Sequence, residues 1–87
     1  MYRLVTLKTF DKKLRKLDKV MRDRVTKWIA SNLIDCENPR LWGKALTGNL
    51  KGRWRYRIGD CRLLVEIRDE ELIIVAIEID HRSAIYK

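Results

Sequence analysis

Cysteine, proline, glycine and histidine are scarce in this sequence of 87 residues, which contains two cysteines, one proline, four glycines and one histidine. Cys36 and Cys61 stand in unrelated contexts without metal-ligand spacing, so we expect two reduced thiols rather than a disulfide or a metal site. No apolar run approaches the ~20 residues that a membrane-spanning helix needs. The longest run, residues 72–77, has only the length of a strand, and the first residues lack the apolar segment of a signal peptide. We therefore expect a cytoplasmic protein without a membrane partner.

Acidic residues are also in short supply. Twelve Asp and Glu face 20 Lys and Arg, which gives a formal net charge of +8. Ten of the 20 basic residues lie between Arg3 and Lys27. This balance indicates nucleic acid, an acidic protein, or both as partners, but it does not specify a fold. The length suits one small domain over residues 1–87, and an apolar content of 46% argues against a disordered basic tail.

The first half of the chain has one strand pattern followed by two helical patterns. Residues 2–8 predict a strand, and Thr9 is expected to cap a short helix with an apolar face. Asp18 is expected to cap a second helix, whose apolar residues follow the 3.6-residue period. The apolar positions of the two helices are Phe10, Leu14 and Leu17, then Met21, Val25, Trp28, Ile29 and Leu33.

The second half predicts three strands, at residues 53–58, 61–68 and 72–79, joined by tight turns. The β-branched content of residues 72–79 indicates a central strand covered on both faces. Residues 35–52 hold the only proline and three of the glycines, so we expect a long connection with little regular structure. It is either a plain connector or, from its place before the arginine strand, a segment that contacts a substrate. The tail, 80–87, has room for a single helical turn. The order β-α-α-β-β-β predicts an α+β fold, in which an N-terminal strand and a three-stranded antiparallel meander carry a two-helix hairpin on one face.

Residues 53–58 alternate arginine with apolar side chains. In a strand, Arg53, Arg55 and Arg57 would share one face, while Trp54, Tyr56 and Ile58 would point into the core. Like charges in one row repel each other. An anionic partner should therefore neutralise the arginines, and a phosphate backbone is the obvious candidate.

Two stretches together resemble the RelE branch of the RelE/ParE toxin superfamily. They are GKALTGNLKGRWRYRIGDCR at residues 43–62 and DHRSAIY at residues 80–86. The resemblance extends over essentially the whole chain. It implies a type II toxin with a fold like that of small microbial RNases, which cleaves messenger RNA in the ribosomal A site without a metal or other cofactor. It also implies a cognate acidic antitoxin as partner, with DNA bound only through the toxin–antitoxin complex.

The resemblance implies by position that activity rests on five residues, and His81 matches a His–Arg pair common in this branch. The five are Arg53, Arg55, Arg62, Arg82 and Tyr86. Candidate catalytic residues are Arg55 on the second strand, Arg62 on the third, and His81, Arg82 and Tyr86 near the C-terminus. Candidate RNA-binding residues are Trp42, Lys44, Lys51, Arg53 and Arg57. We expect Trp28, Trp54 and Tyr56 to belong to the core.

The chemistry of the residues limits their roles. Metal-free RNA cleavage proceeds by attack of the 2′-hydroxyl on the neighbouring phosphate, and it needs a base, an acid and cations around the phosphorane. Arginine can hold two phosphate oxygens, but its pKa above ~12 makes it a poor base. Tyr86 or His81 is left for proton transfer, ahead of Glu78 and Asp80. Two other functions stay open: a ParE-type inhibitor of DNA gyrase without catalysis, and a non-catalytic RNA-binding module.

Overall fold

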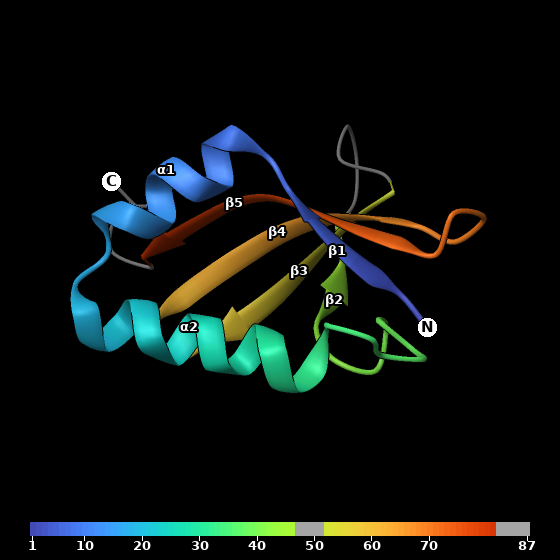
Figure 1. Cartoon of the computed structure of the whole chain (residues 1–87), viewed down its shortest axis with the longest axis horizontal. Coiled ribbons are helices and arrows are strands. Elements are labelled where there is room, and N and C mark those ends of the chain that lie inside the picture. Colours follow the sequence, from blue (N-terminus) through green and yellow to red (C-terminus); the bar gives the residue numbers. More distant parts are fainter. Residues whose placement is uncertain (47–51, 82–87) are drawn as a thin grey trace.

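The computed structural model describes residues 1–46 and 52–81, which form a five-stranded sheet with two helices packed on it (Figure 1). In chain order the elements are β1 (Arg3–Thr6), α1 (Lys8–Lys16), α2 (Lys19–Asn32), β2 (Lys44–Ala45), β3 (Arg53–Ile58), β4 (Cys61–Arg68) and β5 (Ile73–His81). The strand order is β1-β5-β4-β3-β2; β1 runs parallel to β5, and the other neighbours are antiparallel. The predicted α+β arrangement, with a helical hairpin beside an antiparallel meander, is confirmed.

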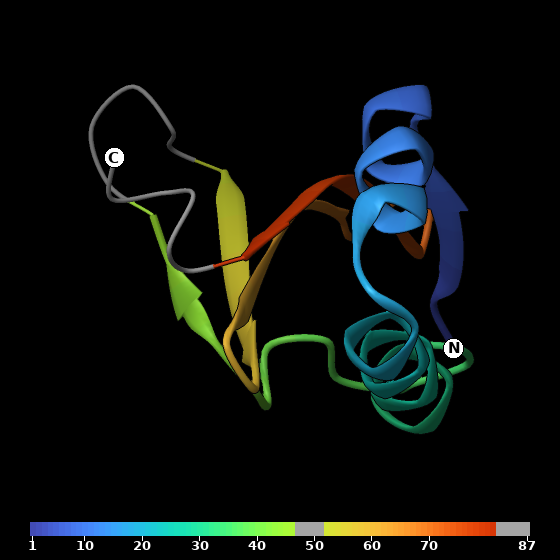
Figure 2. The ribbon, with the colours of Figure 1, turned by 90° about the vertical axis from the view of Figure 1, so that its left-hand side faces the viewer.

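Both helices lie on the same side of the sheet, as Figure 2 shows. The side chain of Asp18 accepts a hydrogen bond from the Met21 backbone N–H at 2.8 Å, so its predicted role as the cap of α2 is confirmed. The predicted cap of α1 was wrong. Leu7 holds that position without a side-chain hydrogen bond, and Thr9 lies inside the helix. The Thr9 hydroxyl instead donates to the carbonyl of Ile77 at 2.5 Å, which ties α1 to β5.

The core fills the space between the helices and one face of the sheet. Tyr56, Ile58 and Leu63 are fully buried on β3 and β4, and Val25 and Leu33 of the α2 region are fully buried opposite them. Alternate residues of β3 and β4 are therefore core, as the period of two predicts. Cys36 and Cys61 are free thiols, and burial raises the pKa of each.

Three features of the second half differ from expectation. The connection predicted to have little regular structure contains the short strand β2, which pairs with Trp54 and Arg55. Strand β5 extends to His81, so Asp80 and His81 belong to the sheet rather than to a terminal turn. The prediction that this strand is covered on both faces was also wrong. Ile74 and Ala76 are buried, whereas Ile73 and Val75 are only partly buried, because the helices cover one face alone.

No helix in the described part of the chain is long and apolar enough to cross a membrane.

Candidate nucleic-acid interface

The predicted row of arginines exists on β3. Tyr56 and Ile58 point into the core, and Arg53, Arg55 and Arg57 alternate with them on the face that the helices leave uncovered. Arg57 is exposed, and the other two arginines are partly buried. The alternation of arginine and apolar residues along β3 therefore produces a basic face.

The register between β3 and β4 divides this face into two parts. Arg53 lies opposite Glu66, with 3.9 Å between the Arg53 Nε and a Glu66 carboxylate oxygen, and Glu66 also accepts from Arg68. Arg57 lies opposite Arg62 instead. On its other side, Arg62 lies opposite Asp80 of β5, so one carboxylate adjoins this pair of arginines. Two like charges directly opposite each other on antiparallel strands are destabilising unless an anion joins them.

A cation cluster therefore forms at one end of β3. We define it as Lys44, Arg55, Arg57 and Arg62. Lys44 of β2 lies opposite Arg55 of β3, and Arg62 of β4 lies opposite Arg57 of β3. Among the residues that the structure describes, no ion pair involves Arg55 or Arg57. A guanidinium group can bind two phosphate oxygens at once.

His81 stands at the end of β5 beside Asp80, the residue that lies opposite Arg62. His81 pairs with Cys61, and it follows the buried Ile79 by two residues, so strand alternation places it on the helix-covered face. There it lines a shallow hollow with Lys13, Lys16 and Leu17. His81 belongs to the strand because β5 continues two residues further than the sequence pattern predicted.

The two acidic candidates for proton transfer are occupied by a lysine. The Lys13 Nζ lies 3.0 Å from a carboxylate oxygen of Asp80 and 3.4 Å from one of Glu78. The hydrogen bond to Asp80 raises the pKa of Lys13, so the lysine stays charged. Both acids thus serve to fasten α1 to β5. Three further candidates, Lys51, Arg82 and Tyr86, lie outside the described residues.

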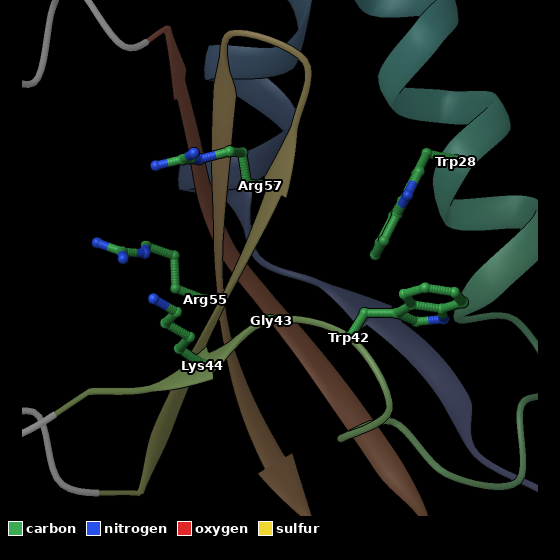
Figure 3. A pocket seen from close by; sticks show the side chains of 6 residues that line it. All are labelled: Trp28, Trp42, Gly43, Lys44, Arg55 and Arg57. Atoms are coloured by element: carbon green, nitrogen blue, oxygen red, sulfur yellow. The ribbon is translucent and has the colours of Figure 1, made fainter.

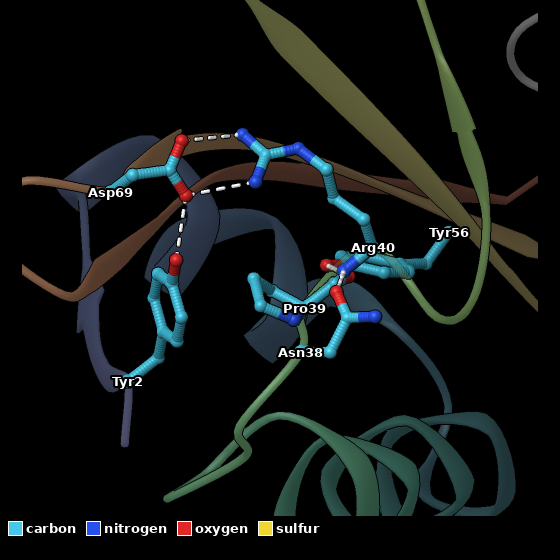
Figure 4. A network of polar contacts seen from close by, with 6 residues as sticks. All are labelled: Tyr2, Asn38, Pro39, Arg40, Tyr56 and Asp69. Atoms are coloured by element: carbon cyan, nitrogen blue, oxygen red, sulfur yellow. Dashed lines mark hydrogen bonds and ion pairs between the residues drawn. The ribbon is translucent and has the colours of Figure 1, made fainter.

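The connection between α2 and β2 is held in place at several points, as Figure 4 shows. The Tyr56 hydroxyl donates to the Pro39 carbonyl at 2.5 Å. The Arg40 guanidinium donates to both oxygens of Asp69, at 2.8 and 2.9 Å, and the Tyr2 hydroxyl donates to the same carboxylate at 2.6 Å. The hydrogen bonds from Arg40 and Tyr2 lower the pKa of Asp69 to about 2. This fastening was not predicted, because Arg40 and Asp69 are far apart in the chain.

The same connection ends in an aromatic residue beside the cation cluster. The Trp54 Nε1–H donates to the Trp42 carbonyl at 2.6 Å, while the Trp42 side chain is 47% exposed. Gly43 follows with φ of +82°, and a Cβ at this position would lie 2.3 Å from the Arg55 carbonyl oxygen. Only glycine lets the chain pass this close to β3.

A cavity of about 320 Å³ opens at this point. It is lined by Trp28, Trp42, Gly43, Lys44, Arg55 and Arg57 (Figure 3). Trp28 was expected to be core. It does pack on Tyr56, with ring centroids 5.3 Å apart, but it is only partly buried and also forms a wall of the cavity. No sequence pattern indicates this second role, because Trp28 fits the apolar period of α2.

The described residues contain no group of acidic, histidine and cysteine side chains suited to a metal ion. The geometry instead combines clustered cations, an aromatic cavity and a fastened connection on one small α+β domain. These features define a small α+β domain with a basic sheet face, a class of site suited to an anionic partner.

Comparison with known proteins agrees with this class. Residues 4–86 match the family of the ParE toxin of type II toxin–antitoxin systems, parDE. A chain of the RelBE2 toxin–antitoxin complex from Mycobacterium tuberculosis is 31% identical, with a TM-score of 0.84 over 93% of this chain and 98% of that one. No curated protein matches the sequence.

More distant structures share the fold. The isolated RelE toxin of E. coli has a TM-score of 0.75 at 24% identity, over 99% of this chain and 92% of that one. A chain of the RelB–RelE complex from Methanococcus jannaschii has a TM-score of 0.67 at 20% identity, over 94% of each chain. The chain is thus a toxin of a type II toxin–antitoxin system. It belongs to the RelE/ParE superfamily, which confirms the resemblance seen in the sequence.

Proposed function

We propose that this toxin is a ribosome-dependent endoribonuclease that cleaves messenger RNA in the A site without a metal. The observation that carries the proposal is the cation cluster, where Arg57 faces Arg62 across two strands and Arg55 has no acidic partner among the described residues. A scissile phosphate bound there would gain charge as the 2′-hydroxyl attacks it, and preorganised guanidinium groups stabilise that charge most strongly in the transition state.

The proton transfers are assigned to Tyr86. Arginine stays protonated, and Asp80 and Glu78 bind Lys13. Strand alternation assigns His81 to the helix-covered face, opposite the face of the cation cluster, which disfavours it as the proton-transfer group. In general, guanidinium groups next to a tyrosine lower its pKa and favour the phenolate form. Arg82 is assigned to the phosphate with Arg62, and Arg53, Lys51 and Lys44 to the flanking backbone.

A cognate acidic antitoxin is proposed as the partner that silences the toxin. The structures from M. tuberculosis and M. jannaschii are toxin–antitoxin complexes. The basic face here suits an acidic, amphipathic segment by charge. DNA would be bound only through such a complex.

Primer extension on messenger RNA tests the activity, with purified toxin added in the presence and absence of programmed ribosomes. We expect cuts within the A-site codon only when ribosomes are present. Arg62→Ala should lower the cleavage rate about 10²-fold or more, because it removes a contact made to the developing charge. The matched control is Arg68→Ala, on the same strand but already bound to Glu66, and it should leave the rate within a few fold of wild type.

Two further variants test the proton assignment in the same assay. Tyr86→Phe should lower the rate about as much as Arg62→Ala, while His81→Ala should have a small effect. An intact message in every lane would contradict the enzymatic function. Loss of activity in His81→Ala, with Tyr86→Phe unchanged, would reverse the assignment.

The family match favours a second candidate, a ParE-type inhibitor of DNA gyrase that catalyses nothing. The same purified toxin can be added to gyrase with supercoiled plasmid. Blocked supercoiling or trapped DNA breaks, together with an intact message, would establish this alternative.

A further inference from the structure

The cavity at Gly43 joins two kinds of chemistry. Indole rings come from Trp28 and Trp42, and positive charge comes from Lys44, Arg55 and Arg57. Figure 3 shows that the three cationic side chains point to one side of β3 while the two indoles lie on the other side, with Gly43 between them. A ligand that reaches from the indoles past Gly43 to the cations would therefore combine a planar, apolar end with an anionic end.

Several contacts hold the aromatic wall of the cavity in place. Trp42 is 47% exposed, yet its backbone is fixed by the hydrogen bond from Trp54, and Arg40 lies over the Trp54 ring at 5.9 Å to its centroid. Arg40 is in turn held by both oxygens of Asp69. An exposed indole on a backbone fastened this firmly loses little conformational entropy when a ligand stacks on it.

We propose that Trp28 and Trp42 form a nucleobase subsite that takes one unstacked base of single-stranded RNA, beside the phosphate bound by Arg55 and Lys44. This inference rests on the proposed function, because it concerns the same substrate. A volume of about 320 Å³ suits one base; it is near the lower end of the ~300–1,000 Å³ found for small-molecule sites. A base paired in a duplex could not present its face to the indoles.

The subsite would act on a nucleotide next to the scissile one and would not take part in bond cleavage. The strand would pass from the cation cluster around the edge of β3 at Gly43, so that the backbone stays on the arginine side and one base turns to the indoles. Stacking on aromatic rings tolerates any base, but its strength differs between bases. We expect purines to bind more tightly than pyrimidines, because their larger rings cover more of the indole surface.

An abasic probe isolates this contact. The strand is a short RNA whose 2′-hydroxyls are methylated, so that it cannot be cut, and a matched set carries one abasic nucleotide at each position in turn. Affinity is measured by fluorescence anisotropy at one fixed salt concentration. One abasic position should weaken binding to the wild-type toxin by about 5- to 150-fold, which corresponds to the ~1–3 kcal/mol of a base stacked on an aromatic ring.

Variants then locate the contact. Trp42→Ala should bind the intact strand about 5- to 150-fold more weakly and should no longer distinguish it from the sensitive abasic strand. Trp42→Phe should restore part of the difference. The control is Leu41→Ala, because Leu41 is the adjacent residue, is 67% exposed and does not line the cavity. This variant should bind both strands as wild type does.

Other results would overturn the inference. They are equal affinity of the wild type for intact and abasic strands, no binding at all, or a Trp42→Ala variant that still discriminates between them. Weaker binding of Trp42→Ala to an acidic peptide of alternating Glu and Leu, with RNA affinity unchanged, would instead show that a protein partner occupies the cavity. If the wild type cleaves messenger RNA and Trp42→Ala binds RNA as the wild type does, this subsite alone is refuted. If the wild type discriminates between intact and abasic strands but cleaves no messenger RNA, only the proposed function is refuted.

Discussion

Replacing Tyr56 by phenylalanine removes one oxygen atom from a buried hydrogen bond between β3 and the connection after α2. The Tyr56 side chain is fully buried, and its hydroxyl donates to the carbonyl of Pro39, whose own side chain is also fully buried. The phenylalanine ring would keep the packing on Trp28, at a centroid distance of 5.3 Å in the wild type. The change therefore isolates one hydrogen bond that joins the sheet to the connection after α2.

The expected loss follows from the burial of the acceptor. A buried carbonyl left without a partner costs about 1–3 kcal/mol of folding free energy. In a domain of this size, 1 kcal/mol lowers the Tm by roughly 4–8 °C. We expect the Tm of Tyr56→Phe to fall by at least about 4 °C in thermal unfolding followed by circular dichroism.

Tyr2→Phe is the matched control, since it removes the same atom from a different setting. The Tyr2 hydroxyl donates to Asp69, whose side chain is 53% exposed and keeps two hydrogen bonds from Arg40. Water can replace the lost donor there, so Tyr2→Phe should be the milder change. A Tm of Tyr56→Phe equal to that of wild type, or higher than that of Tyr2→Phe, would refute the reasoning.

Two other predictions concern the connection that carries Trp42. Gly43→Ala should destabilise the protein and weaken RNA binding, because its Cβ would lie 2.3 Å from a backbone oxygen and its φ is +82°. The control is Gly52→Ala, because Gly52 has φ of +89° but open space around the added Cβ. This variant should lose only the ~1–2 kcal/mol of folding free energy that a left-handed backbone costs. Equal Tm losses in the two variants would contradict the predicted clash. Acid should loosen the same connection. The pKa of Asp69 is lowered from 3.8 to about 2, so its contribution to stability is complete above pH 3.8 and is lost as the pH falls toward 2. Tryptophan emission should shift to longer wavelength over this interval, and the shift should be absent in Asp69→Asn.

The features that the sequence predicted correctly depend on near neighbours in the chain. The alternation from Arg53 to Ile58 placed the arginines on one face, because a strand repeats every two residues whatever it pairs with. The cap at Asp18 was equally local, since its partner is the backbone of Met21. Thr9 failed as a cap because a tertiary contact with Ile77 competed for its hydroxyl.

The site was predicted only in part for the same reason. The basic residues of β3 and β4 were recognised from their motif, but the opposition of Arg57 and Arg62 is a matter of register. The sequence predicted a strand that ends at residue 79, whereas β5 continues to His81. Those two additional residues place His81 in the sheet and so determine its face. No pattern in the chain linked Trp28 to Trp42.

The sequence by itself determined the class of fold, the basic face and the family, because charge, period and motif are properties of consecutive residues. Only the tertiary structure decided which cations meet and which tryptophans form a cavity beside them. It also decided that Arg40 and Asp69 fasten the connection between α2 and β2. Sheet register and helix packing bring residues together across dozens of positions, and the free energy of those contacts is set by burial and geometry that no local pattern contains.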